Sequence, residues 1–208
     1  MKLSVSIAAC LLWMCVALCG GDALAASDPL FDSPVLSSPQ RVEFDAVNRK
    51  LKEHHGLRAV FQQTKHLSVL NRPLTSSGEF VYVEGRGVLW RQKEPFRQTF
   101  VITERGFSEQ LEDGNIQRSP EAAAGAIQGF SGMFLGLFSG DINLLGDQFE
   151  LFFVGNEKSW EIGARPRNGD ISRFIDRIKI KGGAVPEQVT VWEKNGDISE
   201  IKLMPLTK

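Results

Sequence analysis

Three histidines are the first candidates for metal binding or acid–base chemistry in this sequence of 208 residues. His54 and His55 are adjacent, and His66 follows, but none stands at a metal-motif spacing from a second ligand such as a cysteine or an acid. The adjacent pair lies near the end of a predicted helix, where positive charge interacts favourably with the helix dipole. We therefore expect no metal ion and no cofactor.

No other group of reactive residues forms a catalytic pattern. Serines are frequent, yet none lies in the nucleophile elbow that exposes a reactive hydroxyl. The segment Gly85-Arg86-Gly87 is too short to cradle a phosphate, and no helix follows it. The acidic residues are scattered over predicted turns and solvated strand faces. The sequence therefore predicts a protein that is not an enzyme.

The N-terminal segment is typical of an export signal. Lys2 supplies a positive charge, Leu3 to Cys19 is almost continuously apolar, and Ala23-Leu24-Ala25 is a small-x-small cleavage site. We predict a signal peptide over 1–25, a mature chain that begins at Ala26, and a periplasmic location. All the cysteines lie inside this peptide, so the mature chain is expected to have no disulfide and no thiol nucleophile.

Length and charge restrict the rest of the chain. Removing 25 residues from 208 leaves 183, enough for one domain that buries ~70% of its unfolded surface. The 24 Lys and Arg nearly balance the 25 Asp and Glu, and a net charge of −1 gives no electrostatic basis for binding nucleic acid. We expect a flexible, proline-containing arm over 26–41 and a single domain over 42–208 that is a monomer.

A predicted hairpin over 78–95 organises this domain. Two β-rich runs, 78–83 and 88–92, are separated by a glycine-containing turn. Phe80 and Tyr82 share one face of the first strand, and Val88 and Trp90 share one face of the second, because side chains alternate with period two. Large apolar groups on both faces of a strand indicate that both faces are covered, or that one of them lines a cavity.

The remaining elements extend or cover the hairpin. Apolar residues at helical spacing predict a helix over 42–54. The stretch 68–77 is expected to be a long or irregular connection. Antiparallel pairing of successive strands predicts an α+β fold that is mainly antiparallel β. The strands are predicted over 57–65, 98–103, two parts of 107–118, 149–154, 159–164, 177–181, 188–192 and 198–203.

A glycine-rich segment over 119–140 interrupts the strands, and a second helical region is predicted within it, over 119–138. Ser119-Pro120-Glu121 is a strong helix start, and the residues that follow are apolar almost all round. Each glycine costs the helix roughly 0.5–1 kcal/mol relative to alanine. Two interpretations stay open: a core helix that packs closely through its glycine face, or a mobile cover over an apolar cavity. The glycines recur at positions 125, 129, 132, 136 and 140.

Several short motifs follow one another in an order that resembles the LolA-type periplasmic lipoprotein carriers. The N-terminal half of the likeness lies in Phe61-Gln62-Gln63-Thr64, Gly78-Glu79-Phe80, Trp90, Glu94-Pro95 and Val101-Ile102-Thr103. Leu137-Phe138-Ser139-Gly140-Asp141, Trp160, Pro166 and Asn195-Gly196-Asp197 extend it to the C-terminal half, so that it covers about 42–203. The resemblance implies an open β half-barrel that is covered by helices and encloses a hydrophobic cavity for acyl chains.

The same resemblance implies a function and partners. Carriers of this family take lipoproteins from an inner-membrane transporter and pass them to an outer-membrane acceptor. Two alternatives share the fold: a lipid-sensing or chaperone subunit that does not transport, and an outer-membrane receptor. The receptor would need a lipidation signal, and Leu18 is too large for a good one before Cys19.

Two features depart from the family pattern. The best-known members have an arginine at the end of the hairpin's first strand, which holds the lid closed. Here Glu84 stands at that position, and Arg86, two residues later, is the only candidate latch. The usual members also continue into a further C-terminal segment, whereas this sequence ends at Lys208.

The expected ligand-binding residues come from the hairpin, its neighbouring strands and the glycine-rich segment. Alternation alone does not identify which sheet face is concave. The candidates for the acyl-chain cavity are Phe61, Phe80, Tyr82, Trp90, Phe100, Ile102, Phe130, Met133, Phe134, Leu137 and Phe138.

Overall fold

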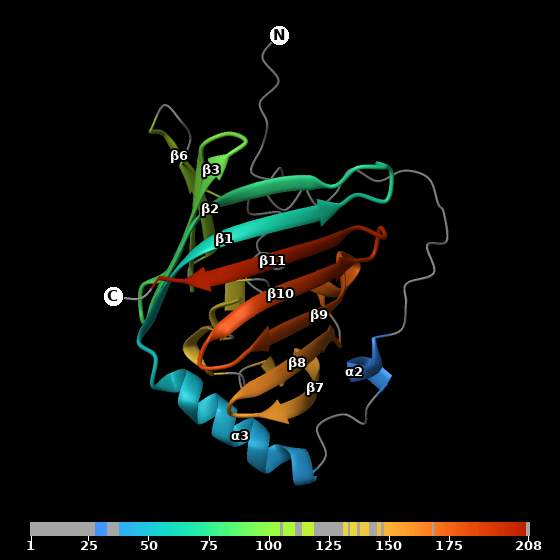
Figure 1. The fold of residues 1–208 in the computed structure, drawn as a ribbon. Helices are drawn as coiled ribbons and strands as arrows, with labels where there is room; N and C mark the ends of the chain where they lie inside the picture. The colour runs from blue at the N-terminus through green and yellow to red at the C-terminus, as the bar shows by residue number, and fades with distance from the viewer. Residues whose placement is uncertain are drawn as a thin grey trace.

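In this computed structural model, one large antiparallel sheet dominates the fold (Figure 1). The structure describes residues 28–32, 38–104, 106–110, 114–118, 131–132, 134–136, 138–141, 145–146, 148–167 and 169–206. Eleven strands of this part are ordered β6-β5-β4-β3-β2-β1-β11-β10-β9-β8-β7, and the sheet is open because its two edge strands do not pair. This arrangement confirms the predicted α+β half-barrel.

The elements follow the predicted meander closely. The helices are α2 (Pro29–Asp32), α3 (Ser38–Lys52) and the 3₁₀ helix η3 (Asp170–Arg173). The strands are β1 (Gly56–His66), β2 (Leu74–Val83), β3 (Gly87–Glu94), β4 (Gln98–Thr103), β5 (Gly106–Gln110), β6 (Ile116–Arg118), β7 (Phe149–Asn156), β8 (Ser159–Pro166), β9 (Ile175–Gly182), β10 (Pro186–Glu193) and β11 (Ile198–Pro205).

The predicted hairpin is formed by β2 and β3, and its register brings its aromatic residues to one face. Phe80 lies opposite Trp90, and Tyr82 lies opposite Val88. Strands β1 and β4 flank the hairpin and add residues to the same face, because directly paired residues project to the same side of a sheet. We call this side the inner face; on β1 to β4 its apolar residues are Leu57, Ala59, Phe61, Phe80, Tyr82, Val88, Trp90, Phe100 and Ile102.

Strands β7 to β11 and helix α3 complete the core. Helix α3 runs along the sheet beside β7 (Figure 1), and the rings of Phe44 and Phe153 meet edge to face with centroids 5.5 Å apart. Trp160, Ile162 and Ile180 are almost fully buried in the same cluster as the inner-face aromatics. The two halves of the sheet therefore share one core, and α3 supports one edge of it.

Several element boundaries differ from the sequence-based prediction, most of all the starts of α3 and β2. Helix α3 begins at Ser38 rather than at residue 42, because proline in the first helical turn loses no hydrogen bond and Pro39 therefore fits there. Strand β2 begins at Leu74, which lies opposite Lys65, whereas 68–77 was expected to be a connection. Backbone pairing with the long strand β1 outweighs the polar composition of residues 75–77.

The arm predicted over 26–41 also contains ordered structure. The short helix α2 places Leu30 and Phe31 on the outer face of the sheet, where Phe31 meets the rings of Phe152 and Trp192 edge to face. An ion pair between Asp28 and Lys179 fixes the start of this helix. The expectation of a wholly flexible arm missed these contacts because two apolar residues are too few to form a periodic pattern. The predicted signal peptide, 1–25, lies outside the described residues.

Candidate functional site

An aromatic cluster on the inner face joins three strands. The Trp90 ring lies on the Phe61 ring, with centroids 4.0 Å apart, and meets Phe80 edge to face at 6.0 Å. On β4, Phe100 stacks on Phe107 of β5 at 5.2 Å. Phe61 and Phe80 are fully buried, whereas Trp90 is half-buried. Trp90 is therefore the ring of this cluster that a neighbouring molecule can reach.

The glycine-rich segment packs on this cluster. Among its described residues, 131–132, 134–136 and 138–139 are helical. Phe138 lies 4.7 Å from Phe80 and 6.0 Å from Tyr82, measured between ring centroids. Phe134 lies 6.2 Å from Phe80 and 6.4 Å from Trp90. These contacts join the segment to the hairpin ring against ring, and Phe134 meets both Phe80 and Trp90 edge to face, a geometry that aromatic pairs favour.

The end of the segment is fixed by polar contacts. Ser139 forms a side-chain hydrogen bond with Tyr82, and Asp141 Oδ1 lies 3.3 Å from Lys52 Nζ at the end of α3. Burial raises the pKa of the Tyr82 hydroxyl, the charge of Glu84 raises it further, and the bond to Ser139 opposes both. Tyr82 therefore stays protonated and can keep its bond to the segment.

The three described glycines of the segment do not form one packing face. Gly140 has a positive φ of 68°, and a Cβ there would lie 2.7 Å from the backbone nitrogen of Lys52. Gly136 faces Leu145, whereas Gly132 is exposed and a Cβ there would meet nothing within 4 Å. Gly140 thus ends the helix against α3, and the closely packed glycine face does not extend to Gly132.

The position of the family latch holds a different interaction. Glu84 Oε2 lies 2.5 Å from His55 Nδ1, and the backbone N–H of Glu84 donates to the carbonyl oxygen of His55. Arg86 lies in the exposed turn of the hairpin, where its backbone N–H donates to Val83. No ion pair or side-chain hydrogen bond joins Arg86 to the described part of the glycine-rich segment, so its role as a latch stays a prediction.

Most of the predicted cavity residues lie together. Within the described residues, seven are buried in one core cluster, and Trp90 packs against that cluster. Phe130, Met133 and Leu137 lie outside the described residues. Sequence reasoning missed the pairing of Ser139 with Tyr82 and of Asp141 with Lys52, because both link positions far apart in the chain. The seven are Phe61, Phe80, Tyr82, Phe100, Ile102, Phe134 and Phe138.

The described part of the chain has neither a metal-binding cluster nor a membrane-spanning helix. No group of three or more His, Cys, Asp or Glu side chains is arranged there to hold a metal ion. No helix of that part is both long enough and apolar enough to cross a membrane.

Solved structures with a similar fold come from several bacteria. A DUF1329 family protein from Desulfovibrio piger is 11% identical, with a TM-score of 0.43 over 80% of this chain and 92% of that one. A LolA superfamily protein from Nitrosomonas europaea is 10% identical, with a TM-score of 0.42 over 80% and 94%. MucB in the MucA/MucB complex from Pseudomonas aeruginosa gives 10% identity and a TM-score of 0.40 over 78% of this chain and 54% of that one. No curated protein matches the sequence.

A family model gives the assignment. The model described as outer membrane lipoprotein carrier protein LolA-like matches residues 36–200, which include α3, every strand except the last residues of β11, and the glycine-rich segment. The match therefore spans the whole aromatic cluster and its cover. The chain belongs to the LolA-like family of outer membrane lipoprotein carrier proteins.

Proposed function

We propose that this protein is a periplasmic carrier whose inner face binds the acyl chains of lipoproteins or other lipids. The observation that carries the proposal is the aromatic contact between the glycine-rich segment and the hairpin. Phe134 and Phe138 both contact Phe80, and Phe134 also contacts Trp90. An acyl chain that enters between these rings replaces one apolar contact with another. The cover can then open without breaking the hydrogen bonds of the sheet.

The energetics of acyl chains favour such a design. Each methylene moved from water into an apolar site gains ~0.8 kcal/mol, so one long chain is worth on the order of 10 kcal/mol. A lipid cannot cross an aqueous compartment without that apolar surface being covered. The aromatic cluster supplies apolar surface, and no charged side chain of the described residues takes part in its ring contacts.

Carrier function implies a route and partners. The export signal predicted over 1–25 would direct the protein to the periplasm, where LolA-like proteins act. We propose that an inner-membrane transporter loads the mature domain, 42–208, and that an outer-membrane acceptor unloads it. Catalysis, metal ions and nucleic acids have no part in this function. Arg86 remains our candidate for a contact that holds the loaded or empty cover closed.

Transfer between membranes tests the proposal. The mature protein should move a fluorescent acyl lipid from donor vesicles to acceptor vesicles, and Gly132→Ala should slow this transfer about two- to fivefold. The alanine methyl meets no neighbour, and it stabilises the helix of the cover by roughly 0.5–1 kcal/mol. A more stable cover opens less often. Gly129, the other glycine suited to this test by sequence, lies outside the described residues.

A matched control separates the cover from general stabilisation. Val42 is 72% exposed on α3, so Val42→Ala raises helix propensity away from the cover and should leave the transfer rate unchanged. Equal slowing by both variants would argue against a gating role for the cover. Lipid binding without any transfer would favour a lipid-sensing or chaperone subunit over a carrier.

A further inference from the structure

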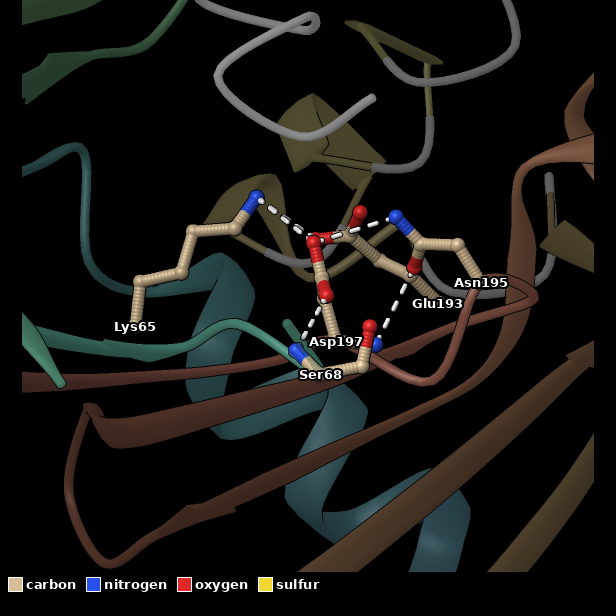
Figure 2. A network of polar contacts seen from close by, with 5 residues as sticks. All are labelled: Lys65, Ser68, Glu193, Asn195 and Asp197. Atoms are coloured by element: carbon tan, nitrogen blue, oxygen red, sulfur yellow. Dashed lines mark hydrogen bonds and ion pairs between the residues drawn. The ribbon is translucent and has the colours of Figure 1, made fainter. Parts of the chain in front are cut away.

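A buried polar cluster lies on the inner face of β1, β10 and β11 (Figure 2). Lys65 Nζ lies 3.0 Å from Glu193 Oε1 and 4.0 Å from Asp197 Oδ2. The three residues are 4%, 5% and 3% exposed, so two acids and one cation are held out of water together. Burying charges in this way costs several kcal/mol per ion unless their hydrogen-bonding capacity is used.

Asp197 is fully paired within the cluster. Its Oδ1 accepts from the backbone N–H of Ser68 at 2.8 Å, and its Oδ2 accepts from Asn195 Nδ2 at 3.0 Å (Figure 2). The backbone N–H of Glu193 also donates to the carbonyl oxygen of Asp197 at 2.9 Å. These bonds shape the turn between β10 and β11 and hold Asp197 in place.

Glu193 and Ser199 are different, because each has a buried polar atom that finds no hydrogen-bond partner among the residues that the structure describes. Glu193 Oε2 and Ser199 Oγ accept or donate no hydrogen bond, and Ser199 is 1% exposed. Ser199 lies directly opposite Lys65 in the pairing of β1 with β11, so it projects to the same side. Unsatisfied buried groups of this kind are rare in folded proteins and call for a specific explanation.

The cluster continues the apolar face along the same strands. On β1, Lys65 follows Phe61 by four residues, about 13 Å at ~3.3 Å per residue, with Gln63 between them on the same side. Gln63 Oε1 accepts from Ser76 Oγ at 3.4 Å on the adjacent strand. The inner face thus changes from aromatic to polar over a distance comparable with part of an acyl chain.

We propose that this cluster binds the hydroxyl-bearing head group of a singly acylated lipid, whose chain lies on the aromatic part of the inner face. The proposal rests on the acyl-chain binding proposed above. A hydroxyl both donates and accepts, so it can donate to Glu193 Oε2 and accept a hydrogen bond from Ser199 Oγ. A phosphate would be repelled by Glu193 and Asp197, and an ammonium would add a further buried charge beside Lys65.

The ionisation of Glu193 agrees with a neutral partner. Burial raises its pKa to about 7, the charge of Lys65 opposes this rise, and the charge of Asp197 adds to it. Near neutral pH the carboxyl group can therefore accept a hydrogen bond as a carboxylate or donate one as an acid. A hydroxyl accommodates both forms.

Two ligands with the same chain test the inference: 1-monopalmitoylglycerol, which has free hydroxyls, and methyl palmitate, which has none. Competition against a fluorescent fatty-acid probe should show that the mature protein binds monopalmitoylglycerol about tenfold more tightly, the value of one or two buried hydrogen bonds. Ser199→Ala should reduce this preference to about twofold or less, whereas Glu193→Gln, whose amide group can still pair with a hydroxyl, should reduce it by a smaller factor. Both replacements keep the size of the cluster, and Gln still offers Lys65 an acceptor.

Thr190→Val is the matched control, because Thr190 is a buried hydroxyl residue of β10 that alternates with the inner-face residues Val189 and Val191. It should keep the tenfold preference. Equal affinity of the unaltered protein for both ligands, or a preference that survives both cluster variants, would overturn the inference and indicate that internal water fills the site. If neither ligand displaces the probe, the acyl-chain function itself fails.

Discussion

Trp90→Glu should abolish binding of a fluorescent fatty-acid probe while leaving the domain folded. Trp90 is half-buried between Phe61, Phe80 and Phe134, so a carboxylate there lies against aromatic rings and replaces apolar surface with charge. Placing an unpaired charge in such a site costs several kcal/mol, which lowers probe affinity by about a hundredfold or more. A titration of probe fluorescence measures the change.

Leu89→Glu is the matched control for this variant. Leu89 precedes Trp90 on β3 and lies opposite Val81 and Val101, so it projects to the outer face. It is half-buried like Trp90. The control should therefore retain probe binding, and thermal unfolding should show whether both variants are folded. A folded Trp90→Glu protein with unchanged affinity would place the acyl site elsewhere.

Lys65→Met should destabilise the protein by about 3–5 kcal/mol near neutral pH, because it leaves Glu193 and Asp197 buried without a cation. Urea unfolding at several pH values measures the loss. The folded-state pKa of Glu193, about 7, lies above its ordinary value of 4.5. Between these values the folded state binds more protons than the unfolded state, so stability falls as pH rises.

The stability of Lys65→Met should fall more steeply with rising pH than the stability of the unaltered protein. Lys65 is the group that lowers the pKa of Glu193, so its removal raises that pKa further. At about pH 5 Glu193 is protonated in both proteins, and their difference in stability should shrink. Lys181→Met, which breaks the partly exposed pair with Glu161, should cost only about 0–1 kcal/mol. If Lys65→Met costs no more stability than Lys181→Met, or if its cost does not change with pH, Lys65 does not neutralise two buried acids as described.

Local patterns in the sequence were sufficient for most of the fold. Alternating apolar residues and glycine-containing turns predicted β2, β3 and the five strands after residue 148, because each pattern lies within one hairpin. The start of α3 at Ser38 and of β2 at Leu74 was missed, since a neighbouring strand or the core decides such boundaries. Helix α2 was missed because Leu30 and Phe31 reveal their role only when the outer face of the sheet is known.

The polar cluster could not be predicted for a related reason. Lys65 and Glu193 are separated by 128 residues, and they become neighbours only because β11 pairs with both β1 and β10. A lysine near the end of a strand, two residues after Gln63, would ordinarily be placed in solvent. The pattern did contain one signal, since period-two spacing puts Lys65 on the same side as Phe61. By contrast, the aromatic candidates were found because large apolar residues on strands are rarely exposed.

Quenching of tryptophan fluorescence by a brominated fatty acid tests the central claim, that acyl chains bind on the inner face. Two single-tryptophan mature proteins are needed: one with Trp160→Phe and Trp192→Phe, which keeps Trp90, and one with Trp90→Phe and Trp160→Phe, which keeps Trp192. Trp192 packs against Phe31 on the outer face. Because bromine quenches an indole only near contact, binding on the inner face predicts strong, saturable quenching of Trp90 and little quenching of Trp192. Quenching of Trp192 alone, or of neither ring at a concentration where the acid is bound, would contradict it.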